Sequence, residues 1–338
     1  MENTPFIVAE LSANHNNSFE VAIETVREFA RRGASAIKLQ TYTPETMTLN
    51  ISKPEFKVDA SNSLWGGRKL FDLYKEAMTP WEWHSDIFEV CKAQGVIGFS
   101  TPFDASSVDF LESIGCPIYK IASFEVVDTQ LIKYVASTGK PMIISTGMAT
   151  LSEIEQAVMA AKSGGCRDIT LLKTTSSYPA SPKDSNLLAM PVLGELFGVK
   201  FGVSDHTMGI GAALAAISLG ASVVEKHVTL SRAAGGVDSS FSMEPDEFEL
   251  LVREAKNVRE SLGKVLFGPT PGDRSSLQFR RSLYLYTDVR AGDELSEENC
   301  RAVRPGYGMA ISNFDLVSGL KFSRDFEKGT PVTMEMFK

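Results

Sequence analysis

The sequence predicts an α/β protein in which a (β/α)8 TIM barrel precedes a small C-terminal domain. Eight short apolar runs alternate with helical patterns over the first ~260 residues, which matches the number and spacing of strands in such a barrel. No GxGxxG turn follows the first run, which disfavours an open dinucleotide-binding sheet. From about residue 278 the helical pattern fades, which indicates a separate unit. The predicted strands are 6–11, 35–42, 95–102, 118–123, 141–147, 168–175, 200–206 and 222–229.

Helical patterns fill most of the gaps between these runs. Residues 18–32 place their apolar side chains on one face behind Ser18, a residue type that favours helix N-caps, and Gly33 ends the pattern. A second helix is predicted over 80–94, with a proline at its first position. A third, rich in small residues, is predicted over 207–219 and should pack closely on the sheet.

The chain is divided into three parts by composition. Residues 1–262 form the predicted barrel, and 263–277, rich in glycine and proline, form a linker. Residues 278–338 form the small domain, and they contain two similar segments. These segments begin at Asp288 and Asp325, an offset of 37 residues, and each is typical of a turn between short strands.

Charge and composition exclude several classes of protein. The net charge of −8, with no basic run, argues against a nucleic-acid-binding protein. No segment approaches the ~20 apolar residues of a membrane span, and the N-terminus lacks a signal-peptide pattern, so we expect a cytoplasmic protein. The cysteines are widely spaced and form no CxxC pair, which predicts buried free thiols. They are Cys91, Cys116, Cys166 and Cys300.

Every predicted strand is apolar at its start and polar at its end, and the C-terminal ends of barrel strands carry the active site. Lys38 and Lys120 come from different strands, and hydroxyl-bearing tips surround them, which suits a small multiply charged anion such as a phosphate ester or carboxylate. Internal Lys–Glu ion pairs are the alternative interpretation. The polar tips include Glu10, Gln40, Ser100, Thr101, Ser123, Glu125, Ser145, Thr146, Ser176, Tyr178 and Ser204.

Two histidines end consecutive strands, so their side chains can converge. His206 and His227 could hold an open divalent site for Mn²⁺, or for a similar ion such as Mg²⁺ or Co²⁺. Hydrogen-bonding histidines of the core are an equally open alternative. Glu10, Glu125 and Asp238 are candidate acid–base or hydroxyl-binding groups, unless each only neutralises a nearby cation.

The last predicted strand holds two further charged residues. Glu225 and Lys226 adjoin His227 and alternate in direction, so one of them should point outward to the helices.

The order of the tip motifs resembles the sialic acid synthase family. The motifs are "AELSANHNNS", "AIKLQTYTPETMTL", "STPF", "YKIAS", "STGM", "GVSDHT" and "EKHVT". The C-terminal part, with "VRPGYG", is similar to the family's antifreeze-like SAF domain. The form "AELSANH", "KLQTYTPETMTL" and the insert "LWGGRKLFDLYKEAMTPWEWH" are most similar to the pseudaminic acid synthase branch. The likeness covers nearly the whole chain.

The resemblance implies an activity and roles for particular residues. The family condenses phosphoenolpyruvate with an open-chain acetamido sugar to a nine-carbon 2-keto acid and releases phosphate. In the pseudaminic branch the sugar is 2,4-diacetamido-2,4,6-trideoxy-altropyranose. The implied phosphoenolpyruvate contacts are Lys38, Thr101, Lys120, Ser123, Ser145 and Ser204, and the implied sugar contacts are Gln40, Glu125, Tyr178 and Asp238. His206 and His227 match the metal ligands, and Glu10 matches a glutamate at the reacting centre.

The resemblance also implies a domain-swapped homodimer, because Arg304 matches an SAF arginine that reaches the partner's barrel. One position departs from the pattern. Ser176 stands where sialic acid synthases carry asparagine, so its contact to phosphate or carboxylate is in question. Lys173, where those relatives have histidine, has no assigned role.

Three alternative functions remain open from the sequence. An N-acetylneuraminate or legionaminic acid synthase would share the catalytic half and differ in the sugar pocket. A non-catalytic sugar-phosphate-binding barrel would keep the fold without the chemistry. An aldolase would use Lys120 to form a Schiff base.

Overall fold

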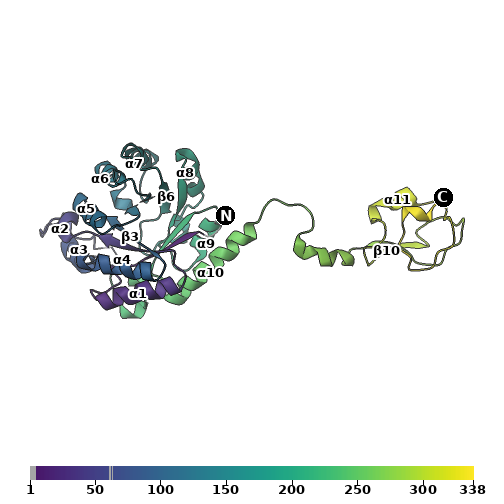
Figure 1. The fold of residues 1–338 in the computed structure, drawn as a ribbon, viewed down its shortest axis with the longest axis horizontal. Coiled ribbons are helices and arrows are strands. Elements are labelled where there is room, and N and C mark those ends of the chain that lie inside the picture. The colour runs from purple at the N-terminus through teal and green to yellow at the C-terminus, as the bar shows by residue number, and fades with distance from the viewer. Residues whose placement is uncertain (1–4, 61, 63) are drawn as a thin grey trace. The chain divides into compact units, whose positions relative to one another are not determined.

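The barrel is closed, and its eight strands are parallel and follow one another around the ring in chain order. The computed structural model describes residues 5–60, 62 and 64–338, and it divides into two compact units, Met1–Gly263 and Lys264–Lys338. The predicted (β/α)8 barrel with a small C-terminal domain is confirmed (Figure 1). The strands are β1 (Phe6–Glu10), β2 (Ala36–Thr41), β3 (Ile97–Pro102), β4 (Tyr119–Ile121), β5 (Met142–Ser145), β6 (Ile169–Thr174), β7 (Lys200–Ser204) and β8 (Val223–His227).

Helices cover the outside of the strand ring (Figure 1). The first of them is capped as its sequence predicts, since the Ser18 hydroxyl accepts a hydrogen bond from the Val21 amide. Its apolar face includes Phe29, which packs edge-on against Phe248. The helices of the barrel unit are α1 (Phe19–Arg31), α2 (Pro44–Met47), α3 (Leu70–Ala77), α4 (His84–Ala93), α5 (Ala105–Ser113), α6 (Thr129–Ala136), α7 (Leu151–Ser163), α8 (Ala189–Phe197), α9 (Gly211–Ser218) and α10 (Pro245–Leu262).

Two predicted helices begin later than expected. The segment predicted to start at Pro80 forms a short 3-10 turn, Trp81–Trp83, before α4 begins at His84. Trp81 turns its indole away to donate to the carbonyl of Tyr42.

The helix predicted over 207–219 begins only at Gly211. Thr207 is held in an extended bridge with Ala180, and its amide donates to Asp205 Oδ1. Because those contacts fix Thr207, it cannot join a helical turn. Gly209, with φ +73°, makes the bend that follows.

The strand register separates an apolar layer from a charged one inside the barrel. Val8 is paired with Ala36, and both are fully buried and apolar. Two residues further along the same strands, Glu10 is paired with Lys38. Since side chains two residues apart share a face, the charged pair lies on the inner face, directly above the apolar pair. The apolar floor therefore supports a polar mouth at the carboxyl ends of the strands.

The second unit is built on the internal repeat. Its core includes Leu295 and Val332, which are equivalent in the repeat and fully buried. Asp288 Oδ1 accepts from the Lys328 amide, and Asp325 Oδ1 accepts from the Ala291 amide, so the two copies bind each other reciprocally. The predicted flanking strands are reduced at this point to an isolated bridge between Val289 and Phe326.

The regular elements of the second unit are few. They are the strands β9 (Ser282–Leu285) and β10 (Cys300–Val303), which pair antiparallel, and the short helix α11 (Phe314–Val317). A 3-10 helix, Pro271–Phe279, begins within the segment predicted as a linker.

Two predictions from the composition concern the cysteines and membrane-spanning helices. All four cysteine thiols are free and buried. Among the helices of the described part of the chain, none combines the length and apolar character needed to cross a lipid bilayer.

Candidate active site

Two lysines and two glutamates meet at the polar mouth of the barrel. Lys38 Nζ lies 2.5 Å from Glu10 Oε2 and 3.7 Å from Glu225 Oε1. Lys120 Nζ donates to both carboxylate oxygens of Glu225, at 3.0 and 3.2 Å. Lys38 also donates to Thr101 Oγ1 at 3.3 Å. The ion pairs that formed the alternative interpretation are thus present, and they stand where the anion site is predicted.

The electrostatics of this charged cluster are set by burial and by close opposite charges. Burial raises the pKa of Glu10 to about 6, although Lys38 opposes the shift. Burial acts on Glu225 in the same direction, but Lys120 and Lys38 outweigh it and lower its pKa to about 2. Burial lowers the pKa of Lys120, against the pull of Glu225. Glu225 therefore stays ionised at neutral pH, and an incoming anion would compete with it for the ammonium groups.

Hydroxyl groups line the mouth beside the lysines. The Gly147 amide donates to Ser123 Oγ at 3.2 Å, and Thr174 Oγ1 donates to Ser145 Oγ at 3.2 Å. Ser176 Oγ is buried and has no hydrogen-bond partner among the described residues. A Cβ added to Gly147 would overlap Ser176 Oγ and come within 2.7 Å of Ser123 Oγ, so the two hydroxyls flank this glycine closely. We call Gly147 and the flanking hydroxyls of Ser123 and Ser176 the hydroxyl cradle. A buried hydroxyl without a partner in such a group indicates a ligand that carries oxygen acceptors.

The hydroxyl of Ser204 contacts Glu225, the glutamate that both lysines share. Ser204 Oγ donates to Glu225 Oε1 at 2.9 Å, so the hydroxyl holds the carboxylate that faces Lys120. Three of the predicted phosphoenolpyruvate contacts therefore meet around one carboxylate, namely Lys38, Lys120 and Ser204.

The two predicted metal ligands face each other at the ends of β7 and β8. The ring centroids of His206 and His227 are 5.2 Å apart. Burial lowers the pKa of His206 to about 4 and lowers that of His227 well below its usual value, so both rings are neutral at pH 7. His227 Nδ1 is buried without a hydrogen-bond partner in the described part of the chain, 3.7 Å from Asp238 Oδ2. Neutral imidazoles with a free nitrogen are the form that binds metal ions.

The histidine pair fits an open divalent site. His206 Nδ1 lies 2.9 Å from the carbonyl of Thr175, which fixes its ring and leaves Nε2 as the coordinating nitrogen. Across residues 5–60, 62 and 64–338, no group of three or more His, Cys, Asp and Glu side chains is arranged to hold a metal ion. The pair would therefore supply two protein ligands, with further positions left for substrate and water. The metal itself stays a prediction.

A cavity of about 340 Å³ opens beside the charged cluster, with Gln40 and His227 in its lining. Its polar side chains include three predicted sugar contacts, Gln40, Glu125 and Asp238. Burial raises the pKa of Glu125 to about 7, and its Oε2 has no hydrogen-bond partner among the described residues. The rest of the lining is mostly aromatic and aliphatic, from Tyr42, Met47, Val58, Trp65, Leu70, Leu73, Tyr74, Ala77, Phe103, Phe124, Tyr178 and Val237.

A short hydrogen-bond chain joins the charged cluster to this cavity. Gln40 Nε2 donates to Glu10 Oε1 and to Ser12 Oγ, both at 3.2 Å. Ser12 Oγ in turn donates to Asp238 Oδ2. Burial raises the pKa of Asp238. The charged cluster and the cavity are therefore coupled through side chains of β1 and β2 and of the loops after β1 and β8.

Sequence reasoning missed residues that the structure brings to the site. Glu225 is the common partner of both lysines, and it lies two residues before His227 on β8. That spacing puts both on the inner face, which was the available signal. Lys226 is the residue that points outward, as predicted for one of the two. Trp65 comes from the insertion between β2 and β3, where no strand period could place it.

The chain has two further histidines, His15 and His84. His15 accepts from the Asn17 amide and packs edge-on against Trp83, and His84 is bonded to Thr41 and Pro80, so both are structural.

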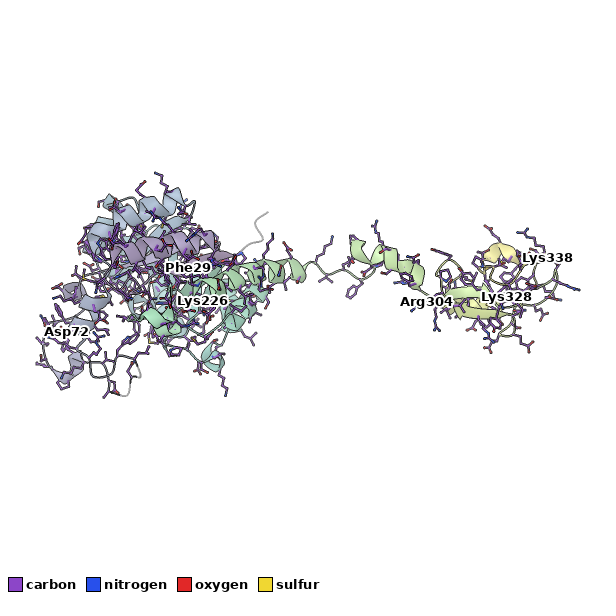
Figure 2. The ribbon with its side chains drawn as sticks, turned by 90° about the horizontal axis from the view of Figure 1, so that it is seen from below. Phe29, Asp72, Lys226, Arg304, Lys328 and Lys338 are labelled. Atoms are coloured by element: carbon purple, nitrogen blue, oxygen red, sulfur yellow. The ribbon has the colours of Figure 1, made fainter. Side chains whose placement is uncertain are left out.

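Lys173 and Arg304 are the two remaining positions named from the sequence. Lys173 donates to the carbonyl of Thr174 at the outer side of β6. Arg304 belongs to the second unit, where it is exposed after β10 (Figure 2).

Comparison with known proteins agrees with this arrangement. Residues 25–266 match the NeuB family, and residues 280–338 match the SAF domain. The chain is 41% identical over 336 residues to the pseudaminic acid synthase of Helicobacter pylori, covering 99% of this chain and 98% of that protein. It is 34% identical to the N,N'-diacetyllegionaminic acid synthase of Legionella pneumophila, covering 98% and 94% of the two chains.

A solved structure carries the same fold. The citrate complex of N-acetylneuraminic acid synthetase from Leptospira borgpetersenii is 32% identical, with a TM-score of 0.72 over 82% of this chain and 92% of that one. The matched family covers most of the chain, including seven of the eight barrel strands. The chain belongs to the NeuB family, and its second unit is a SAF domain.

Proposed function

We propose that this protein is a pseudaminic acid synthase. It condenses phosphoenolpyruvate with 2,4-diacetamido-2,4,6-trideoxy-altropyranose, adds water and releases phosphate, which leaves a nine-carbon 2-keto acid. One observation supports this most strongly. Two buried lysines and a hydroxyl cradle meet a pair of neutral histidines beside a largely apolar cavity, at one end of the barrel.

The choice of sugar is supported by two features. Identity to a pseudaminic acid synthase is 41%, against 34% to a legionaminic acid synthase. The cavity wall supplied by Trp65, Leu70 and Leu73 is apolar. Such a wall suits a sugar that carries acetamido methyl groups and lacks a 6-hydroxyl, because an unpaired hydroxyl buried there would cost free energy.

Phosphoenolpyruvate binds at the charged side of the mouth. Lys38 and Lys120 neutralise its carboxylate and phosphate, and the hydroxyls of Thr101, Ser123, Ser145, Ser176 and Ser204 hold the anion oxygens. Positioning both charged groups fixes the enol carbon toward the sugar, an orientation effect that can supply several kcal/mol. Ser176 fills this role in place of the asparagine of sialic acid synthases, through its unpartnered hydroxyl.

The sugar binds over the histidines. His206 and His227 would hold a divalent cation, Mn²⁺ or a similar ion, which when bound polarises the aldehyde oxygen as a Lewis acid. Gln40, Glu125, Tyr178 and Asp238 orient the sugar from the cavity side. The enol carbon then attacks the aldehyde carbon, and a new carbon–carbon bond forms.

Glu10 acts on the step that follows. Water adds at C2 of the phosphoenolpyruvate unit, and the tetrahedral intermediate expels phosphate. Glu10 Oε2 lies 2.5 Å from Lys38 Nζ and accepts from no other described side chain, so this oxygen keeps a lone pair that can receive a hydrogen bond from that water. The carboxylate orients or deprotonates the water.

The working form is a domain-swapped homodimer in the cytoplasm. Arg304 lies exposed in the SAF domain and would complete the site of the partner subunit with a further positive charge. The proposal is supported by family membership and by the motif "VRPGYG" around Arg304.

A sugar panel tests the function. Purified protein is given phosphoenolpyruvate, Mn²⁺ and each candidate acetamido sugar, and phosphate release is measured together with the product mass. We expect turnover with the 2,4-diacetamido-2,4,6-trideoxy sugar well above N-acetylmannosamine. Preference for the legionaminic precursor would reassign the sugar, and no turnover with any sugar would favour a non-catalytic binding barrel. A product that borohydride traps on Lys120 would indicate a Schiff-base aldolase instead.

A further inference from the structure

A second buried ion pair lies on the outer side of β7 and β8, behind the histidines. Lys226 Nζ donates to Asp205 Oδ2 at 3.1 Å and to the carbonyl of Thr207 at 2.6 Å. Asp205 Oδ1 accepts from the Thr207 amide at 2.9 Å. Asp205, Lys226 and Thr207 form what we call the outer clamp. It encloses the residue between Asp205 and Thr207, which is His206.

The outer clamp is removed from solvent and from the reaction. Lys226 is 1% exposed, and Figure 2 labels it within the barrel unit. The neighbouring outward side chains of these strands, Val203 and Val224, belong to the apolar layer between barrel and helices. A buried ammonium group costs several kcal/mol unless it is paired, and the chain bears this cost at a place outside the lining of the cavity.

Each contact of the clamp fixes backbone that carries a predicted metal ligand. Lys226 directly precedes His227 on β8, and its ammonium reaches the carbonyl on one side of His206 and the carboxylate on the other. The Asp205 amide also donates to the carbonyl of Glu225, at 2.9 Å. The ends of β7 and β8 are therefore tied together on the outer face, while the two imidazoles face each other on the inner face.

We propose that Lys226 is a positioning residue that, through Asp205 and Thr207, sets the separation and orientation of His206 and His227. Buried ion pairs are weak contributors to stability compared with apolar side chains of the same volume, which leaves fixed geometry as the reason to keep one here. This inference rests on the proposed function for its catalytic meaning, but not for its structural content.

Histidine NMR tests the structural content directly. The chain has four histidines, of which His15 and His84 lie away from the clamp. With ¹³C-histidine labelling, Lys226→Met should shift the imidazole signals of His206 and His227 and leave those of His15 and His84 in place. Lys226→Arg, which retains the charge, should move the signals of His206 and His227 less far from their wild-type positions. If Lys226→Met does not fold, Asp205→Asn takes its place in the experiment. This change removes the negative charge and keeps an oxygen that can accept from the Thr207 amide.

Metal binding and kinetics test the catalytic meaning. Free Mn²⁺ measured by electron paramagnetic resonance should show a dissociation constant raised about tenfold in Lys226→Met, the usual effect of losing a group that orients metal ligands. The KM for the sugar should rise by a similar factor, while the KM for phosphoenolpyruvate changes less. Lys140→Met, which breaks a partly exposed ion pair with Glu112 before β5, is the control for loss of a paired lysine away from the outer clamp and should change neither quantity.

The outcomes separate the two proposals. Unshifted His206 and His227 signals in the folded Lys226→Met and Asp205→Asn proteins would overturn the clamp, whatever the enzyme does. Shifted signals with unchanged Mn²⁺ affinity and sugar KM would also overturn it as a positioning device. If wild-type protein neither binds Mn²⁺ nor turns over, the proposed function fails, and the NMR result still decides the structural claim.

Discussion

The two sides of the barrel mouth are built in opposite ways. The side proposed to bind phosphoenolpyruvate comes from strand ends and is filled by ion pairs among Glu10, Lys38, Lys120 and Glu225. The side proposed to bind the sugar is an open cavity, and the insertion between β2 and β3 supplies much of its wall, including Trp65 and Leu73. The charges, which need precise placement, lie on rigid strands, whereas the surface proposed to select the sugar lies on connecting segments.

Removing the charge of Glu10 should give the largest effect, and it tests the strand side. Glu10→Gln keeps the shape of the side chain but can no longer take a proton from water. We expect kcat to fall about a hundredfold, within the usual range of acid–base contributions. Steady-state phosphate release measures it, with Gln40→Glu as a neighbouring change of charge at the same site. A kcat within a few-fold of the wild-type value would rule out this role for Glu10.

Filling the hydroxyl cradle should have the next largest effect. In Gly147→Ala the added methyl group must displace the hydroxyls of Ser176 and Ser123. The KM for phosphoenolpyruvate should therefore rise at least about tenfold, which corresponds to ~1.4 kcal/mol of lost binding. Gly211→Ala is the matched control, because a Cβ there meets nothing within 4 Å. Unchanged phosphoenolpyruvate kinetics in Gly147→Ala would remove the cradle from the anion site.

Truncating the cavity wall should separate the two sides. Trp65 packs against Tyr178, with ring centroids 5.8 Å apart, and its indole donates to the carbonyl of Val237. Trp65→Ala should raise the KM for the sugar about tenfold and leave the KM for phosphoenolpyruvate within twofold, because the loss of one large aromatic contact is worth ~1–2 kcal/mol. Trp65→Phe should recover part of the affinity. An equal rise in both KM values would show that the two sides are not independent.

The smallest expected effect concerns stability at the border of the cavity. Burial raises the pKa of Glu125 from 4.5 to about 7, so the folded state holds a proton that the unfolded state releases between these values. Folding stability is therefore lost as the pH rises from 4.5 through 7. Glu125→Gln should increase the free energy of unfolding by about 1–3 kcal/mol at pH 8 and by almost nothing at pH 4.5.

Denaturant unfolding of Glu125→Gln and wild type at both pH values measures this difference. The same variant should bind the sugar more weakly, which is the expected trade of stability for function at a binding site. A destabilised variant at pH 8 would contradict the assigned state of Glu125.

Much of the site was predictable because strands obey a simple period. The predicted strands contain Lys38, Gln40, Lys120 and His227. The alternation of side chains along a strand determines which of them face the barrel interior, and the barrel fold brings the carboxyl ends of all strands to one rim. The repeat that begins at Asp288 and Asp325 was also recognisable in the sequence, and in the structure its two copies are joined by reciprocal hydrogen bonds. The start of α9 was not, since the contacts of Thr207 come from Asp205 and Lys226 rather than from its own helix.

The sequence alone determined the order of the strands, the side chains at their ends and the residue types proposed to bind an anion and a metal ion, because these depend on neighbours along the chain. Tertiary structure alone decided the partners. Lys120 and Glu225 are 105 residues apart, and Trp65 reaches Val237 across 172. Such contacts depend on closing the ring and folding the insertion over it, and no local pattern encodes which two distant side chains those movements bring together.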